Sequence, residues 1–194
     1  MAEVVHSNKP QSRYPFEPFV QLIMRRWKDA PDRSRIRCLD LGCGVGANSQ
    51  FLAEQGFRVT ALDIDLDNLG VLERRIKSTL IEPIEANLCN WIDWEARQKY
   101  YDCILDHETL CHVTNPPYRW IYDALKPGGV FYTRAPRDDC WQGVAEGKKF
   151  TRFAKRDQIL GLMHSGGFTK IDLDELTYTY RGRKYASWLV EAHK

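Results

Sequence analysis

The chain of 194 residues is 43% hydrophobic and 28% charged, with a net charge of +2. This length and hydrophobic content predict one domain over 1–194 and leave no room for a second sizeable one. The small net charge does not favour a nucleic-acid partner, and no apolar run approaches the ~18 residues that would suggest a membrane-spanning helix.

The N-terminus has no basic region followed by an apolar core, so we expect no secretory signal. The six cysteines form no C-x-x-C pair, and several fall in apolar runs where a free thiol packs as a small hydrophobe. We therefore expect a cytoplasmic protein without membrane contact, present as a monomer or a homodimer.

Apolar periodicity predicts helices that alternate with strands along the chain. An N-terminal arm and helix occupy 1–34, and a core of alternating elements occupies 35–194. The predicted strands are 35–41, 57–63, 80–86, 101–106, 129–135, 168–176 and 184–193, and the predicted helices are 15–29, 46–56, 66–78, 116–125 and 156–166. This alternation predicts an α/β fold with one doubly wound, mostly parallel sheet and helices on both faces.

Two features refine the predicted sheet. Pro83 lies inside the third strand and cannot donate to a strand ladder, so that strand should lie at a sheet edge. The last two strands are separated only by a tight connection around "RGRK", so they should pair antiparallel.

The stretch "LDLGCGVGA" ends the first strand and opens a helix, which is where doubly wound sheets bind nucleotides. Gly42, Gly44 and Gly46 permit a tight turn and a close approach to a ligand. With Ala47 the run also fits the pattern G-x-G-x-x-A, so an NAD-dependent enzyme is one alternative. Asp63 ends the second strand and suits a ribose diol in either case.

Asp40 favours a different cofactor. It lies two residues before Gly42, close to where a pyrophosphate would rest, and a carboxylate there would repel that dianion. S-adenosylmethionine has no phosphate but carries an ammonium and a sulfonium, which Asp40 would attract. The alternative is that Asp40 is a turn residue that hydrogen-bonds the glycine loop.

Five stretches, "CLDLGCGVG", "ALDID", "ANL", "YDCILDHETLCHV" and "LKPGGVFYT", resemble successive motifs of class I S-adenosylmethionine-dependent methyltransferases. The resemblance runs from Arg35 to the C-terminus, and "FTRFAKRDQILGLMHSGGFTKID" resembles members that act on small molecules. It implies a Rossmann-like, seven-stranded sheet in the order 3-2-1-4-5-7-6.

The resemblance also implies which residues bind the cofactor, S-adenosyl-L-methionine. Asp40, Gly42, Cys43 and Gly44 would hold its methionine end, and Asp63 would bind the ribose.

The adenine and the methyl group have their own implied neighbours. Ile64 would flank the adenine, with Asn87 and Leu88 beside it. The family often has aspartate where Asn87 stands, and an asparagine oxygen can still accept a hydrogen bond from the adenine amino group. Asp106 ends the fourth strand and would face the methyl group.

His107 follows the fourth strand directly and is the candidate general base, with Asp106 as the second candidate catalytic residue. An oxygen acceptor would require such a base, whereas a neutral amine would not. His112 is equally well explained as a packed or capping residue. Metal is not expected, because "HETLCH" is one residue longer than the zinc motif H-E-x-x-H and no further ligands cluster near His107 and Cys111.

Other side chains are weaker candidates for the acceptor site. Arg134 and Arg137 lie at the end of the fifth predicted strand and just beyond it, and would either meet an acidic group of the substrate or stay solvated. Aromatic residues that could wall a pocket, or belong to the core instead, are Tyr14, Trp141, Tyr178 and Tyr180.

The tetrapeptide Asn115-Pro116-Pro117-Tyr118 reads NPPY, which holds the target nitrogen in some amino-methyltransferases. There it follows the fourth strand at once, but here Asp106-His107-Glu108-Thr109 fills that place. NPPY instead precedes a predicted helix, where Thr114 or Asn115 can cap and proline suits the first turn. We therefore interpret it as a helix start.

The favoured function is methyl transfer to an oxygen or nitrogen of a small molecule, since the chain is nearly all catalytic domain. A first alternative is an RNA or protein methyltransferase that uses the basic segments "KKFTRFAKR" and "YRGRK". A second alternative, from another class, is a protein that binds the cofactor without catalysis.

Overall fold

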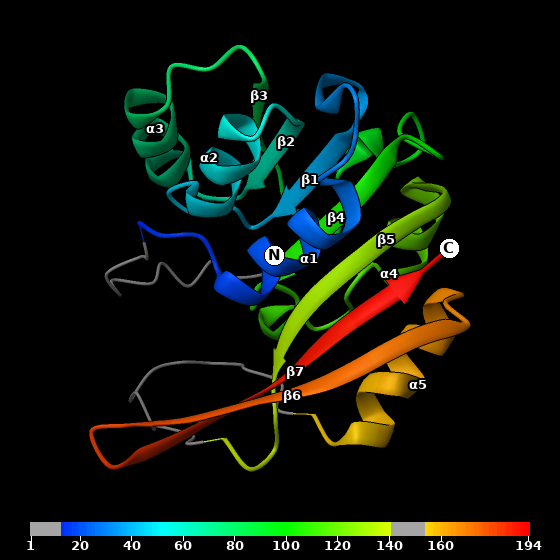
Figure 1. Cartoon of the computed structure of the whole chain (residues 1–194). Coiled ribbons are helices and arrows are strands. Elements are labelled where there is room, and N and C mark those ends of the chain that lie inside the picture. The colour runs from blue at the N-terminus through cyan, green and yellow to red at the C-terminus, as the bar shows by residue number, and fades with distance from the viewer. Residues whose placement is uncertain (1–12, 141–153) are drawn as a thin grey trace.

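The computed structural model describes residues 13–140 and 154–194. Its seven strands form one sheet in the order β3-β2-β1-β4-β5-β7-β6 (Figure 1). The pairs from β3 to β5 are parallel, and β7 runs antiparallel to both β5 and β6. The strands are β1 (Arg37–Leu41), β2 (Arg58–Asp63), β3 (Ile81–Glu85), β4 (Tyr101–His107), β5 (Leu125–Pro136), β6 (Lys170–Tyr180) and β7 (Arg183–His193).

This sheet confirms the predicted fold class, including the strand order implied by the resemblance. Pro83 lies in β3, and β3 is an edge strand as predicted. The last two strands are antiparallel, as their short connection indicated.

Helices cover both faces of the sheet (Figure 1). They are α1 (Glu17–Trp27), α2 (Ala47–Glu54), α3 (Leu66–Arg75), α4 (Tyr118–Ala124) and α5 (Arg156–Gly166). One core cluster joins α1 and α2 to the sheet through side chains such as Phe19, Ile23 and Leu52. The N-terminal helix is therefore part of the packed core, because burial of these apolar side chains holds it there.

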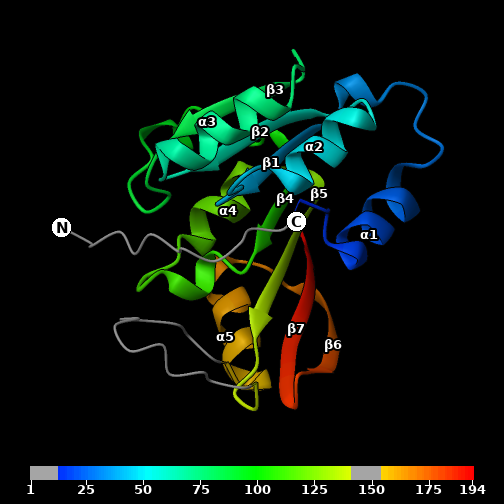
Figure 2. The ribbon, with the colours of Figure 1, turned by 90° about the vertical axis from the view of Figure 1, so that its left-hand side faces the viewer.

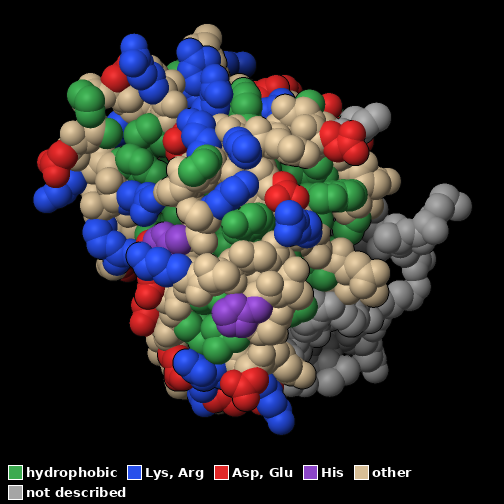
Figure 3. Space-filling view, turned by 90° about the vertical axis from the view of Figure 1, so that its right-hand side faces the viewer, with side chains coloured by type: hydrophobic (Ala, Val, Ile, Leu, Met, Phe, Trp, Pro, Cys, Tyr) green, Lys and Arg blue, Asp and Glu red, His purple; other side chains and the backbone are tan. Residues whose placement is uncertain are grey.

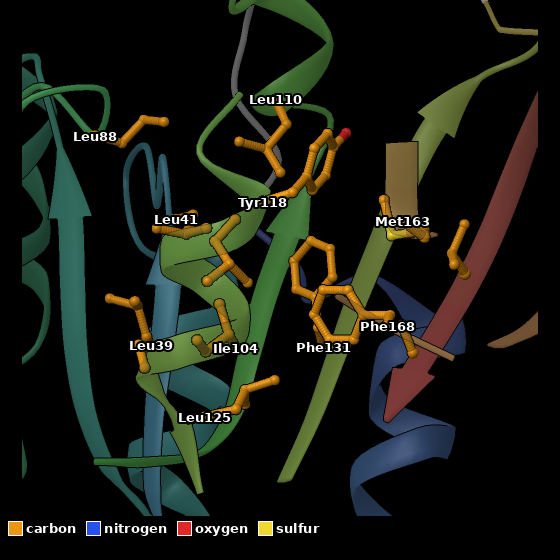
Figure 4. Close-up of a cluster of buried hydrophobic side chains, with 14 of the residues drawn as sticks. Leu39, Leu41, Leu88, Ile104, Leu110, Tyr118, Leu125, Phe131, Met163 and Phe168 are labelled. Carbon is orange, nitrogen blue, oxygen red and sulfur yellow. The ribbon is translucent and has the colours of Figure 1, made fainter. Parts of the chain in front are cut away.

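A second core cluster lies on the opposite face, under α4 and α5. Figure 4 shows this cluster, which includes Leu39 and Ile104 from the sheet and Tyr118, Met163 and Phe168. The rings of Phe131 and Phe168 stack with centroids 5.7 Å apart. These contacts fix α4 and α5 beside β4 and β5.

Two element boundaries differ from prediction by four residues, namely the end of β6, which was predicted over 168–176, and the start of β5. The strand was predicted over 129–135 but begins at Leu125, which pairs with Tyr101 before the register shifts to Cys103 with Val130. The "KPGG" turn is thus absorbed as an irregularity within the strand. Gly128 makes this possible because its φ of +77° is readily adopted only by glycine.

The hairpin of β6 and β7 extends beyond the end of β5. The last residue of β5, Pro136, pairs with Ser187, whereas pairing between β6 and β7 continues to Tyr180 with Arg183. The hairpin tip therefore extends past the carboxyl end of β5. The carboxyl ends of the parallel strands face the viewer in Figure 2.

Candidate active site

The loop after β1 turns through three glycines with positive φ. The angle is +62° at Gly42, +55° at Gly44 and +84° at Gly46. A Cβ on Gly42 would lie 2.2 Å from Thr109 Oγ1, so only glycine fits there. The backbone N–H of Cys43 donates to the carbonyl of Leu62 at 3.0 Å. The loop is thus held at the carboxyl ends of β1 and β2, where ligands bind in doubly wound sheets.

Asp40 lies beneath this loop and is almost fully buried, with 1% of its surface exposed. Its Oδ2 accepts a hydrogen bond from Ser49 Oγ at 2.6 Å. Burial raises the pKa of Asp40 to about 7, and the charges of Asp63 and Asp106 act in the same direction, although the Ser49 hydrogen bond opposes them. A cation bound close to Asp40 would therefore stabilise its charged form.

Asp63 ends β2 and binds the backbone on both of its carboxylate oxygens. Oδ2 accepts from the Gly44 N–H at 2.7 Å, and Oδ1 accepts from the Asp65 N–H at 2.9 Å. The next side chain, Ile64, is 41% exposed. Asp63 therefore shapes the glycine loop and retains a further lone pair on each oxygen.

The segment after β3 brings Asn87 and Leu88 to the same edge of the sheet. Asn87 Oδ1 accepts from the Cys89 N–H at 3.0 Å, while Leu88 is buried in the core. The predicted cofactor residues thus come from the ends of β1, β2 and β3, as the resemblance implied. Their individual contacts with a cofactor remain predictions.

Asp106 is the residue before the last in β4, one residue short of the strand end that the sequence predicted, and both of its carboxylate oxygens accept hydrogen bonds. Its Oδ1 accepts from the N–H groups of Thr109 (2.8 Å) and Leu110 (3.0 Å), and its Oδ2 accepts from Thr133 Oγ1 at 2.5 Å. Burial raises its pKa to about 6, against these hydrogen bonds. Asp106 thus holds the turn after β4, and its catalytic role stays a prediction.

His107 also belongs to β4 and faces Arg134. The distance from His107 Nε2 to Arg134 Nη1 is 3.1 Å. Because a guanidinium only donates, Nε2 accepts here and the ring proton lies on Nδ1. Burial, together with the Arg134 charge, lowers the pKa of His107 to about 4. The lone pair that a general base would use is therefore occupied, so this geometry does not favour the predicted role.

Sequence reasoning missed three residues at this edge. Phe16 stacks on His107 with ring centroids 4.5 Å apart, and its N–H donates to Asn48 Oδ1 at 3.0 Å. Thr109 packs against Gly42, as described above. Only Asn48 could have been found from the sequence, because it directly follows the glycine loop. The contacts of Phe16 with His107 and of Thr109 with Gly42 join distant parts of the chain.

The remaining acceptor-site candidates are dispersed. Tyr14 is 82% exposed, and Tyr178 and Tyr180 lie on the protruding β6–β7 hairpin. Trp141 lies outside the described residues. Arg137 is close to Asp139 and Glu175 and stacks over Trp188, so its charge is paired.

NPPY stands directly before α4, which begins at Tyr118 with Pro117 as its N-cap residue. The interpretation as a helix start is confirmed. The N-cap residue is Pro117, whose side chain makes no capping hydrogen bond. Asn115 is exposed.

We expect Asn115→Ser to leave both thermal stability and methyl-transfer rate unchanged, since Asn115 caps nothing that serine would lose. Thermal melting and a transfer assay measure the two quantities. A fall in turnover of more than about tenfold with unchanged melting would place Asn115 at the reacting nitrogen, because a lost transition-state contact of about 1.4 kcal/mol has that effect.

Two classes of feature are absent from the part of the chain described here. Over 13–140 and 154–194, no three His, Cys, Asp or Glu side chains gather closely enough to hold a metal ion. Over the same residues, every helix is too short or too polar to cross a membrane.

A hollow of about 480 Å³ lies at the other end of the strands, by the amino ends of β1 and β2. Three arginines line it, Arg35, Arg37 and Arg58, with Asp32 and Ser34. Figure 3 shows this side of the molecule, where Lys and Arg side chains gather. The hollow is separate from the glycine loop, because the two lie at opposite ends of β1.

Comparisons with known proteins agree with this geometry. A family model described as "Methyltransferase domain" matches residues 12–189. A squalene methyltransferase from Botryococcus braunii is 30% identical over 105 residues, which are 50% of this chain and 27% of the relative. A ubiquinone biosynthesis O-methyltransferase from Burkholderia vietnamiensis is 26% identical over 167 residues, which are 77% of this chain and 72% of the relative.

A solved structure has the same fold. It is phosphoethanolamine N-methyltransferase 2 from Haemonchus contortus, in complex with phosphomonomethylethanolamine and S-adenosylhomocysteine, with a TM-score of 0.70 and 16% identity. The match covers 90% of this chain and 52% of that one. This chain thus spans about a quarter of the squalene enzyme and about half of the solved structure.

Proposed function

The chain belongs to the methyltransferase-domain family, and from this membership we propose that it is an enzyme that transfers a methyl group from S-adenosyl-L-methionine to a small-molecule acceptor. The observation that carries the proposal is the set of three carboxylates around the glycine loop, Asp40, Asp63 and Asp106. Their mutual repulsion contributes to the raised pKa of Asp40. Such a site attracts an ammonium and a sulfonium and repels the pyrophosphate of NAD.

The residues at this edge suit the parts of the cofactor in turn. Gly42, Cys43 and Gly44 would offer backbone carbonyl oxygens to the ammonium of the methionine end, above Asp40, because the N–H groups of Cys43 and Gly44 are already bonded. Asp63 uses its remaining lone pairs for the ribose hydroxyls, as a carboxylate oxygen accepts more than one hydrogen bond.

The adenine end of the site is less polar. The exposed Ile64 gives an apolar surface for the ring, and Leu88, which is buried in the core, is the second predicted apolar neighbour. Asn87 keeps its amide N–H₂ and a second oxygen lone pair for the ring edge, since only one lone pair is used by Cys89.

When bound, the cofactor supplies a sulfonium-activated methyl carbon. The protein's own contribution is alignment of the acceptor with that carbon and exclusion of water, which can account for much of the acceleration in such displacements. No protonatable side chain with a free lone pair is required for a neutral amine. The paired state of His107 is compatible with this chemistry.

The acceptor is proposed only as a small molecule methylated at oxygen or nitrogen. The similar proteins are named as a squalene methyltransferase, an O-methyltransferase and an N-methyltransferase. Their methyl acceptors therefore differ in chemistry. The monomeric or homodimeric state and the cytoplasmic location stay predictions.

Calorimetry with S-adenosylhomocysteine, S-adenosylmethionine and NAD tests the cofactor. We expect binding of the two sulfur compounds and none of NAD; tighter binding of NAD would refute the proposal. A transfer screen with methyl-labelled cofactor against metabolite pools, glycans and RNA tests the acceptor class. Label in RNA with none in metabolites would favour the first alternative, and binding without any transfer would favour a non-catalytic protein.

We expect cofactor affinity to increase with pH, because Asp40, with a pKa of about 7 in the free protein, must lose its proton to pair with the ammonium. The affinity should rise on the order of tenfold between about pH 5.5 and 7, as linkage requires when binding releases one proton. Calorimetry in buffers of different ionisation enthalpy measures both the affinity and the released proton.

The matched control is Asp40→Asn, which keeps an oxygen acceptor for Ser49. This variant should bind more weakly and without the pH dependence. An unchanged slope would assign the titration to another group at the site, such as Asp106.

A further inference from the structure

Phe16, the residue before α1, contacts elements on both sides of the point where the two halves of the sheet diverge. The chain leaves β1 toward β2 on one side and leaves β4 toward β5 on the other, while β1 and β4 are neighbours. Ligands bind in the crevice at such a switch point. Phe16 is attached to both sides of it, through Asn48 in the first turn of α2 and through His107 at the end of β4.

The contact between Phe16 and His107 is a stacked pair. The two rings lie 19° from parallel, with centroids 4.5 Å apart. Arg134 also packs over the Phe16 ring, with its guanidinium carbon 4.9 Å from the centroid. Phe16 is thus enclosed by one neutral ring and one cation, each a favourable neighbour for an aromatic face.

Arg134 is itself fixed by further partners. Its Nε donates to Ser187 Oγ at 3.1 Å and lies 3.1 Å from Glu108 Oε1. Its side chain is 12% exposed. Because Arg134 donates to His107 Nε2, the imidazole has one tautomer and one ring orientation. His107 therefore presents a fixed flat surface to Phe16.

We propose that His107 is a positioning residue: held by Arg134, it seats Phe16 across the crevice between β1 and β4 and so keeps residues 13–16 over the bound cofactor. The inference rests on the proposed function, because it assumes that the crevice holds S-adenosylmethionine. It assigns His107 a role that uses the ring face and the Nε2 lone pair, in place of proton transfer.

The dissociation rate of S-adenosylhomocysteine from the full chain tests this role. Phe16→Ala and His107→Ala should each speed dissociation roughly three- to tenfold, the range expected when one aromatic pair is lost. The double variant should be no faster than either single one, since both remove the same contact. Phe16→Tyr keeps the ring and should match the wild type, and Tyr180→Ala, an exposed aromatic on the distant hairpin tip, is the control for a general effect.

Two further measurements separate positioning from catalysis and from folding. Nitrogen-15 NMR should show His107 protonated on Nδ1 alone from pH 8 down to pH 5.5. Trypsin cleavage after Arg13, an exposed residue, should accelerate in Phe16→Ala and His107→Ala at unchanged melting temperature.

The outcomes distinguish the two proposals. If the wild type does not bind S-adenosylhomocysteine, the proposed function fails. Faster cleavage after Arg13 in the variants would still support the positioning of Phe16 by His107. If dissociation and cleavage are both unchanged in the two variants, the positioning role is overturned. Additive effects of Phe16→Ala and His107→Ala would also overturn it.

Discussion

Asp63→Ala is expected to weaken S-adenosylmethionine binding by about 2 kcal/mol, because charge-assisted hydrogen bonds to the ribose are lost. The same change also removes the hydrogen bonds that Asp63 accepts from the N–H groups of Gly44, at 2.7 Å, and Asp65, at 2.9 Å. Both losses act at the same edge of the sheet. Calorimetry gives the dissociation constant, and thermal melting shows whether the variant is still folded.

Asp65→Ala is the matched control for loss of a carboxylate. Asp65 Oδ1 accepts from the Asp67 N–H and caps α3, so its removal should lower the free energy of unfolding by about 1 kcal/mol. The cofactor affinity should change little. Equal affinities of Asp63→Ala and the wild type, in a folded protein, would remove Asp63 from the site.

Gly42→Ala is expected to have the larger structural effect. The new Cβ would lie 2.2 Å from Thr109 Oγ1 and 2.8 Å from Thr109 Cβ, on a backbone with φ of +62°. Overpacking costs about 1–3 kcal/mol, and a left-handed non-glycine residue adds about 1–2 kcal/mol. The loop or the turn after β4 must therefore shift, and cofactor affinity should fall by more than about tenfold, or 1.4 kcal/mol.

A second substitution separates the two causes. Thr109→Gly removes the three atoms nearest to the new Cβ, so Gly42→Ala/Thr109→Gly should recover part of the affinity lost in Gly42→Ala. The backbone strain at residue 42 remains in the double variant. If the double variant binds no better than Gly42→Ala, the collision with Thr109 is not the reason why glycine is required.

Local patterns predicted the fold class and two details of the sheet, whereas the strand order was implied by the family resemblance. Strand–helix alternation indicated the sheet, and Pro83 placed β3 at its edge because a residue without an N–H cannot pair on both sides. The β5 boundary was wrong since "KPGG" has the composition of a turn. Leu125 and Val130, on either side of these four residues, pair with β4, and Gly128 and Gly129 bond the backbone of Lys194. Tertiary contacts of this kind leave no local signal.

The candidate site was predictable in its glycines and carboxylates but not in how they are held. Asp40 and Asp63 follow from strand ends and a glycine loop, which are local features. The hydrogen bond between Thr109 and Gly42 joins residues 67 positions apart. The stacking of Phe16 on His107 also depends on the folded sheet. The base role predicted for His107 assumed a free lone pair, and Arg134 was not expected to occupy it.

The sheet order has a consequence for synthesis of the protein. β7 lies between β5 and β6 although it is the last strand of this chain. While a nascent chain on the ribosome ends before β7, the five parallel strands can assemble, but β5 presents an unpaired edge and β6 has no neighbour. Unpaired edges invite pairing with other chains. We therefore expect chains arrested before Arg183 to engage chaperones far more than the complete chain does.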